Sequence, residues 1–352
     1  EIRASDWSSD VCSSDLKSIK SISYAKYGYM FIAPFFIVYC IFQLWPLINT
    51  FRLSFYGNGK TLETFVGLKN FQNILFGSET SIPAQAIHEE FFNYFQNTII
   101  IWLGNFVPQI ILSLLLAVWF TDAKLKIPGK GFFKVIMYMP NIITAASVSA
   151  LFLVLFGDGK YGAINSLLLS KEMIVEPIRF ITDKTNSRIL VMFIQTWMWF
   201  GNTMIMLMSG IMGINPSLFE AANIDGANSF QIFRKVTLPL LRPIMVYTLI
   251  TSMIGGLQMF DIPYLLHTGN TLVPHIQTAA VFVYEKFHKT PYSPSYGYSA
   301  AASVILFFIT GILGIFVFFF NRDKDEAERK KKLKKLKKQA KMRNKGFGGL
   351  DL

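Results

Sequence analysis

The sequence predicts an all-α membrane protein with six transmembrane helices, and three observations lead to this fold class. Of its 352 residues, 52% are hydrophobic and only 16% are charged, whereas soluble domains carry about a quarter charged residues. Six apolar segments are each long enough for the roughly 20 helical residues that cross a bilayer. Lys and Arg are concentrated before the first span, in the loop between the second and third, and after the sixth, whereas the outer loops are near charge balance.

The six apolar segments follow one another along almost the whole chain and are predicted as continuous helices. Any one of them alone could be a buried core helix, but six in series with short basic loops favour membrane spans. Several contain prolines, which a membrane bundle tolerates because neighbouring helices and polar side chains bind the freed carbonyl groups. The predicted spans are residues 28–50, 97–120, 133–156, 189–213, 244–265 and 298–320.

Positive charge near the ends of the spans predicts that both termini face the cytoplasm. Three Lys and no acidic residue lie between residue 17 and the first span, four Lys against one Asp lie in 122–134, and a run of Lys and Arg occupies 322–345. The remaining loops are longer and near charge balance: 51–96, 157–188 and 266–297. This arrangement places segment 214–243, between the fourth and fifth spans, in the cytoplasm.

The chain divides into four predicted parts. Residues 1–16 are expected not to belong to the folded protein, because 6–16 (DWSSDVCSSDL) resembles the translation of a sequencing adapter, and the genuine start is then missing. Residues 17–93 hold the first span and an outer loop, and 94–320 form a core domain of five spans. Residues 321–352 form a basic cytoplasmic tail that is expected to lie against anionic membrane lipids.

A short polar segment between the fourth and fifth spans carries the strongest motif. It reads EAANIDGA at 220–227, followed by Phe233 and by TLPLLRP at 237–243. Asn215 before Pro216 predicts a helix start, and the glycine of the motif predicts a turn before the helix resumes. The predicted product is a helix-turn-helix along the inner membrane face, whose small side chains let another subunit approach closely. A capped surface loop without a partner is the alternative.

This segment resembles the coupling loop of ABC importer permeases, whose pattern is E-A-A-x-x-D-G-A, then F, then T-L-P-x-L-x-P. The resemblance extends over residues 27–320 and is closest to the carbohydrate-uptake branch, that of the larger maltose-transporter permease. The stretches that carry this wider resemblance are Asn97-Thr98, Phe132-Phe133 to Pro140, YGAIN at 161–165 and Thr196-Trp197. The resemblance implies the type I permease fold with a cytoplasmic coupling helix-turn-helix. It also implies that the ATPase is contacted by Glu220, Ala221, Ala222, Asp225, Gly226, Ala227, Phe233 and Pro239.

The resemblance further implies a permease subunit of an ATP-driven importer for a sugar or oligosaccharide in the bacterial cytoplasmic (inner) membrane. The implied partners are a second, homologous permease, a dimer of a cytoplasmic ABC ATPase, an extracytoplasmic solute-binding protein, membrane lipids and the sugar itself. ATP and Mg would bind the ATPase, so no cofactor and no enzymatic activity is expected in this chain. Nucleic-acid binding is not expected, although the tail is strongly basic.

Polar and aromatic side chains at membrane depth predict where a sugar binds, because such groups usually face a cavity or a partner helix. In the fourth span, Gln195, Trp199 and Asn202 fall at i, i+4 and i+7 on one helical face, with Met198 beside them. The fifth span offers Gln258 and Asp261 at i and i+3. Aromatic rings stack on sugars and amides bind their hydroxyl groups. The alternative is that the amides join helices to one another.

The main alternative function is a secondary sugar transporter driven by an ion gradient. It would need intramembrane carboxylates or cation ligands, and the spans offer only Asp261. A membrane-anchored enzyme is a weaker alternative, because Gly59-Lys60-Thr61 lacks the first glycine of a phosphate-binding loop and Gly297 to Ala301 lacks residues that would activate a serine. The histidines have no metal-ligand spacing, and outside 1–16 the only cysteine is Cys40. No catalytic and no metal site is therefore expected.

Overall fold

The computed structural model describes residues 25–57, 64–78, 81–122, 125, 127–268, 271–288, 295–320, 332–334 and 336. The predictions made for residues 1–16 and for most of the basic tail therefore lie outside the described residues. The chain separates into two compact units, Glu1–Arg52 and Leu53–Leu352.

The described part of the first unit is one long apolar helical run. Its α2 (Ala25–Tyr39) passes through a π-helical turn, Cys40–Leu44, into α3 (Trp45–Leu53). The backbone N–H of Trp45 donates to the carbonyl of Cys40, five residues earlier, which is the hydrogen bond that defines this wider turn. Pro34 lies inside α2 without ending it.

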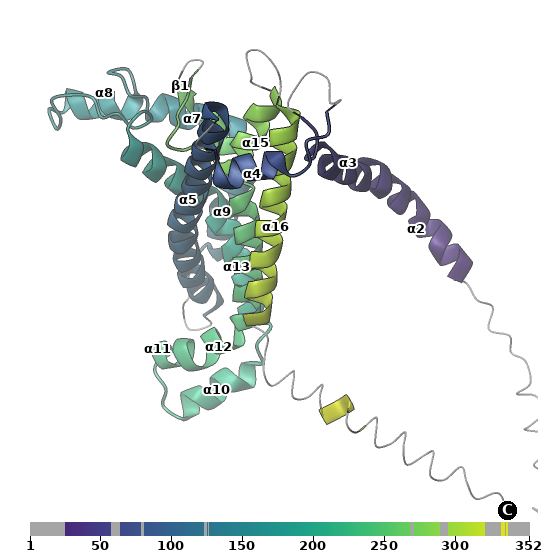
Figure 1. The fold of residues 1–352 in the computed structure, drawn as a ribbon. Helices are drawn as coiled ribbons and strands as arrows, with labels where there is room; N and C mark the ends of the chain where they lie inside the picture. The colour runs from purple at the N-terminus through teal and green to yellow at the C-terminus, as the bar shows by residue number, and fades with distance from the viewer. Residues whose placement is uncertain are drawn as a thin grey trace, which may run out of the picture. The chain divides into compact units, whose positions relative to one another are not determined.

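The second unit is a bundle of helices with one two-residue β-hairpin, β1 (His267–Thr268) with β2 (Thr271–Leu272), so the all-α prediction is confirmed (Figure 1). Its helices are α4 (Lys69–Phe76), α5 (Ile82–Thr121), α6 (Lys130–Tyr138), α7 (Ala145–Leu155), α8 (Ala163–Ser170), α9 (Lys184–Met212), α10 (Pro216–Ile224), α11 (Ser229–Ile232), α12 (Leu238–Leu240), α13 (Arg242–Leu257), α14 (Asp261–Leu265), α15 (Ala279–His288) and α16 (Tyr296–Phe320). A 3-10 turn, Met139–Ile142, follows α6, and a π-helical turn, Phe233–Thr237, follows α11.

Five helical runs among the described residues are long and apolar enough to cross a membrane, and a bent pair makes a sixth span. The five are Tyr27–Leu53, Ile82–Thr121, Lys184–Met212, Arg242–Leu265 and Tyr296–Phe319, and the pair is Lys130–Ile142 with Ala145–Leu155. The prediction of six spans is thus confirmed if the bent pair is counted as one. With 40 residues, α5 is about 60 Å long and begins well before the predicted start at residue 97.

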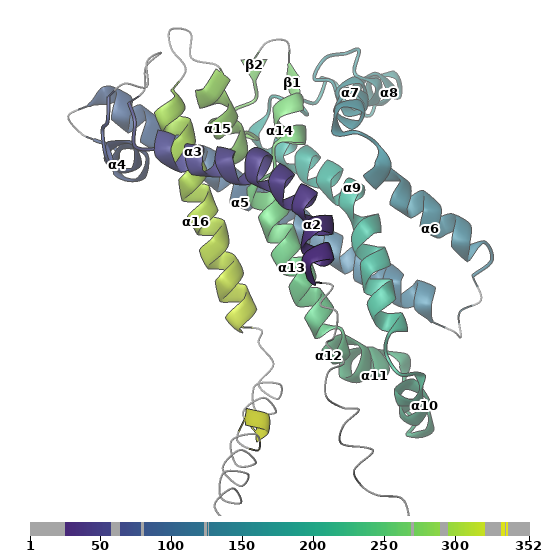
Figure 2. The same cartoon turned by 90° about the vertical axis from the view of Figure 1, so that its right-hand side faces the viewer.

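The prediction of a continuous helix over 133–156 is wrong, because the two halves of this span meet at a bend of 94° (Figure 2). Pro140 has no backbone N–H to continue the helical ladder, and the chain tightens into the 3-10 turn there. Ile143 is then extended, with φ −73° and ψ 137°. Thr144 starts α7 afresh by accepting a hydrogen bond from the backbone N–H of Ser147 at 3.3 Å.

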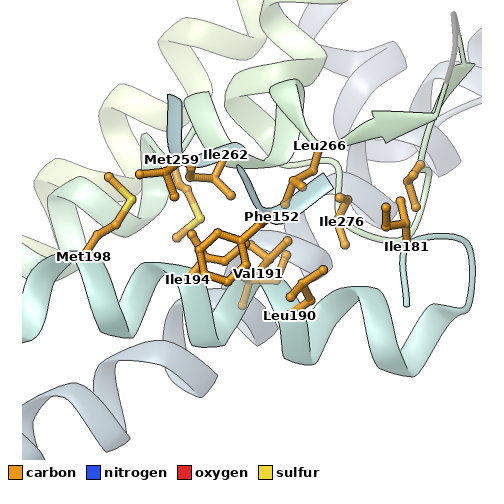
Figure 3. Packing of buried hydrophobic residues seen from close by; sticks show 13 residues of the cluster. Phe152, Ile181, Leu190, Val191, Ile194, Met198, Met259, Ile262, Leu266 and Ile276 are labelled. Atoms are coloured by element: carbon orange, nitrogen blue, oxygen red, sulfur yellow. The ribbon is translucent and has the colours of Figure 1, made fainter. Parts of the chain in front are cut away.

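The packing of α5 against α9 forms the centre of the second unit, with three buried apolar clusters around it. One joins α7, α9 and α14, and in Figure 3 side chains of α9 such as Val191 and Ile194 point toward Phe152 of α7. A second joins α5, α9 and Leu241, and a third joins α4, α5, α15 and α16 around the fully buried Phe282. These clusters hold the helices whose remaining faces surround the cavity described next.

Candidate functional site

A cavity of about 390 Å³ lies among α5, α9, α13 and α14. Its volume falls within the range of pockets that hold small-molecule ligands. Its lining includes all six residues that the sequence predicts for substrate binding, namely Gln195, Met198, Trp199, Asn202, Gln258 and Asp261. The structure therefore brings together predicted side chains of two spans, although Asn202 and Gln258 are more than fifty residues apart in the sequence.

The α9 wall follows the predicted helical face. Gln195 and Met198 are buried, whereas Trp199 and Asn202 are exposed toward open space. Met198 also belongs to the apolar cluster between α9 and α7, so its side chain is held by packing. The α9 wall thus combines the packed side chain of Met198 with the indole ring of Trp199 and the amides of Gln195 and Asn202, which line the cavity.

The wall from the fifth span differs from the prediction. Gln258 and Asp261 do not share a helical face, because α13 ends at Leu257 and α14 begins at Asp261. At the break, Phe260 has φ −127° and ψ −53°, outside the helical region. Both side chains still line the cavity, because the interruption turns the backbone there. Non-helical backbone at membrane depth is tolerated where it lies inside protein or lines a cavity.

Four of the polar side chains that line the cavity are free to bind a ligand. Within the described part of the chain, Gln195, Asn202 and Gln258 make no side-chain hydrogen bond, and Asp261 has neither a hydrogen bond nor an ion pair. The described residues therefore show no role for Gln195 or Asn202 in joining helices within this chain.

Other polar groups join α5 to α9. The side-chain amide of Gln109 donates to Thr203 Oγ1 at 2.8 Å, and Ser113 Oγ donates to the carbonyl of Phe200 at 2.7 Å. Thr196 Oγ1 donates to the carbonyl of Asn105 at 3.1 Å. Such interhelical bonds are worth about 1 kcal/mol each in membranes. These bonds hold the cavity walls in place and leave the amides of Gln195, Asn202 and Gln258 without a partner among the described residues.

A third wall of the cavity, from α5, was missed by the sequence reasoning. Trp102, Asn105 and Gln109 lie at i, i+3 and i+7 on one face of this helix and line the cavity. Their polarity at membrane depth is the signal that could have revealed them. Trp102 Nε1 donates to Ser252 Oγ at 3.2 Å, which joins α5 to α13 at the cavity wall. Further lining residues of α13 were also missed: Tyr247, Thr248, Thr251, Gly255 and Gly256.

The predicted helix-turn-helix lies at one end of the bundle, far from the end that carries α7, α8 and α15 (Figure 1). Its first helix, α10, begins as predicted, because Asn215 Oδ1 accepts from the backbone N–H of Ser217 at 3.1 Å and Pro216 occupies the first turn. It ends at Ile224, two residues before Gly226, which has φ +73°. The backbone N–H groups of Gly226 and Ala227 donate to the carbonyls of Asn223 and Ala222 at 3.1 and 3.0 Å. These two bonds form a Schellman motif, which needs the left-handed conformation at Gly226.

The second half of this segment is also held by local bonds. Asn228 and Gln231 form a reciprocal capping box, with distances of 2.9 and 2.8 Å, at the start of α11. The chain then runs through the π-helical turn and α12 to Leu241, which is fully buried against α9. The sequence-predicted residues differ in exposure: Glu220, Ala221, Asp225, Gly226 and Pro239 are exposed, whereas Ala222, Ala227 and Phe233 are half-buried. We call residues 215–243 the coupling segment.

Residues 97–325 match the protein family described as "Binding-protein-dependent transport system inner membrane component". The chain belongs to this family. It is therefore a multi-pass permease of the inner membrane, as the resemblance found in its sequence implies. Among its relatives, the lactose transport system permease protein LacF of Rhizobium radiobacter is 30% identical over 298 residues, which is 84% of this chain and 94% of LacF. The arabinooligosaccharides transport system permease protein AraP of Bacillus subtilis is 28% identical over 287 residues, 82% of this chain and 86% of AraP.

The fold of this permease is also found in a solved structure. A chain from a bacterial ABC transporter involved in the import of the acidic polysaccharide alginate superposes with a TM-score of 0.72 at 22% identity, covering 86% of this chain and 97% of that chain. The same alginate transporter has been solved in complex with a periplasmic protein bound to an alginate pentasaccharide, and that chain matches with a TM-score of 0.71. The predicted importer permease fold is thus confirmed.

Proposed function

We propose that this permease forms half of the translocation pathway of an ATP-driven ABC importer for a sugar or oligosaccharide. The observation that carries the proposal is the cavity at membrane depth, where free amides and aromatic rings converge in a permease of this family. The names of LacF and AraP, which describe transport of lactose and arabinooligosaccharides, support the substrate class.

The chemistry of the cavity suits a sugar. Trp199, Tyr247 and Phe260 supply aromatic rings that can stack on the C–H face of a pyranose. Gln195 and Gln258 supply amides that can both donate to and accept from hydroxyl groups. A second, homologous permease would complete the pathway, and the sugar would pass between the two subunits.

The coupling segment would contact a dimer of a cytoplasmic ABC ATPase, which binds ATP and Mg and performs the hydrolysis, so this chain itself carries no enzymatic step. This proposal requires both termini to be cytoplasmic, as the charges near the spans favour. An extracytoplasmic solute-binding protein would deliver the sugar at the opposite end. ATP and the loaded binding protein would bias the complex toward the outward-open state, and hydrolysis would reset it.

The test is sugar uptake by proteoliposomes that hold the complete complex, with Gln195→Ala and Gln258→Ala compared with the wild type. We expect wild-type uptake to require ATP and the binding protein. Each substitution removes hydrogen bonds to the sugar, for which we expect a loss of about tenfold, while the subunits still co-purify. Uptake that follows an ion gradient without ATP would overturn the proposal in favour of a secondary transporter. Unchanged uptake in both variants would remove these residues from the sugar site.

A further inference from the structure

The charge of the cavity is set by one residue of this chain. Among the described residues that line it, Asp261 is the only Asp or Glu, and no Lys, Arg or His lies with it. The rest of the polar lining consists of amides, hydroxyl groups and indole or phenol rings. The contribution of this chain to the cavity is therefore negative.

Nothing in the described part of the chain neutralises this carboxylate. The ion pair found there, Lys286 with Glu90 at 2.6 Å, joins α15 to α5 and lies outside the cavity lining. Asp261 is exposed toward the cavity and accepts no hydrogen bond from described residues. A carboxylate left open in this way has all its acceptor positions available to a ligand.

An unpaired carboxylate discriminates between sugars by their charge. The hydroxyl groups of an uncharged sugar can donate to it in charge-assisted hydrogen bonds, which are stronger than bonds between neutral groups. A sugar that carries its own carboxylate would instead meet a like charge inside the protein, where the effective dielectric constant is well below that of water. The alginate transporter that shares this fold is involved in the import of an acidic polysaccharide. The fold itself therefore does not exclude acidic substrates, and any selection against them must come from the residues that line the cavity.

We propose that Asp261 makes the cavity of this permease selective for uncharged sugars and excludes sugars with a carboxylate. The inference rests on the proposed function, because it concerns the substrate of the same cavity. It goes further in naming a charge class and the residue that determines it.

The test uses the complete, detergent-purified complex without its binding protein, so that the selectivity of the binding protein does not enter. Lactose and maltose are each compared with the derivative whose terminal primary hydroxyl is oxidised to a carboxylate, and binding is measured by saturation-transfer NMR. We expect the wild type to bind each neutral sugar at least about tenfold more tightly than its acid. Asp261→Asn keeps the size and most hydrogen-bonding capacity of the side chain but removes its charge, and should reduce this ratio to below about threefold.

The control is Glu176→Gln, which removes an exposed carboxylate outside the cavity lining and should leave the wild-type ratio unchanged. A wild-type ratio near one, or a ratio that persists in both Asp261→Asn and Asp261→Ala, would overturn the inference while leaving sugar import intact. Failure of the wild type to bind or import any neutral sugar would instead overturn the proposed function, so the two failures are distinguishable.

Discussion

Substitution of Gly226 in the coupling segment gives the sharpest test of the proposed contact with an ATPase. Gly226 has φ +73°, and an added Cβ would have no atom within 4 Å, so the effect of a larger side chain is purely conformational. A β-branched residue rarely adopts the left-handed region, and we expect Gly226→Val to cost about 2 kcal/mol. Asn tolerates that region, so Gly226→Asn should cost less than about 1 kcal/mol. Neither change introduces a clash or a charge.

The ATPase is expected to bind the turn in its left-handed conformation. The free energy that a substitution costs in this conformation is therefore lost from the free energy of ATPase binding. A cost of 2 kcal/mol then weakens binding of the ATPase by about thirtyfold, whereas the Asn variant should lose less than about fivefold. The assay is titration of the purified permease pair with the ATPase, followed by sugar uptake in proteoliposomes. Equal affinities for the Val and Asn variants would refute the reasoning, because they would show that the left-handed turn has no bearing on the contact.

Two further glycines support predictions about packing. At Gly256, an added methyl group would overlap the indole ring of Trp102, so Gly256→Ala should push that ring into the cavity and lower sugar uptake by about tenfold without loss of assembly. At Gly201, the methyl group would overlap the backbone carbonyl oxygen of Met137, and Gly201→Ala should reduce stability by about 1–3 kcal/mol, seen as a lower melting temperature of the complex. Gly311→Ala, which adds a methyl group in open space, is the control for both, and results equal to this control would contradict the packing described.

Local signals allowed the first half of the coupling segment to be predicted. Asn215 with Pro216 defines the start of α10, and Gly226 defines its end, because caps and left-handed turns depend on a few neighbouring residues. The same holds for the α9 wall of the cavity, since a regular helix brings residues at i, i+4 and i+7 to one face. These features required no knowledge of the other helices.

The bend of the third span could not be predicted in this way, because a proline alone does not show whether a membrane helix will be interrupted. Pro34 and Pro108 lie inside helices that continue past them, whereas Pro140 lies in a 3-10 turn after which the span bends by 94°. The end of α6 packs closely against α9, because Gly201 leaves no side chain between α9 and the backbone of Met137 and Tyr138. The interruption of the fifth span between Leu257 and Asp261 directly follows Gly255-Gly256, a pair that favours a turn, and it determines where Gln258 lies.

The arrangement of α9 and α13 explains how one segment could act on the whole cavity. The coupling segment begins where α9 ends and ends where α13 begins, and both helices line the cavity along their other turns. Their ends are packed tightly, because Gly210 of α9 leaves room only for Ile244 and the buried Leu241. A displacement of the coupling segment would therefore move the ends of α9 and α13 together rather than bend one of these helices alone. Because α13 is interrupted directly beside Gln258 and Asp261, such a movement can change the orientation of these two side chains while the packed helical body stays intact.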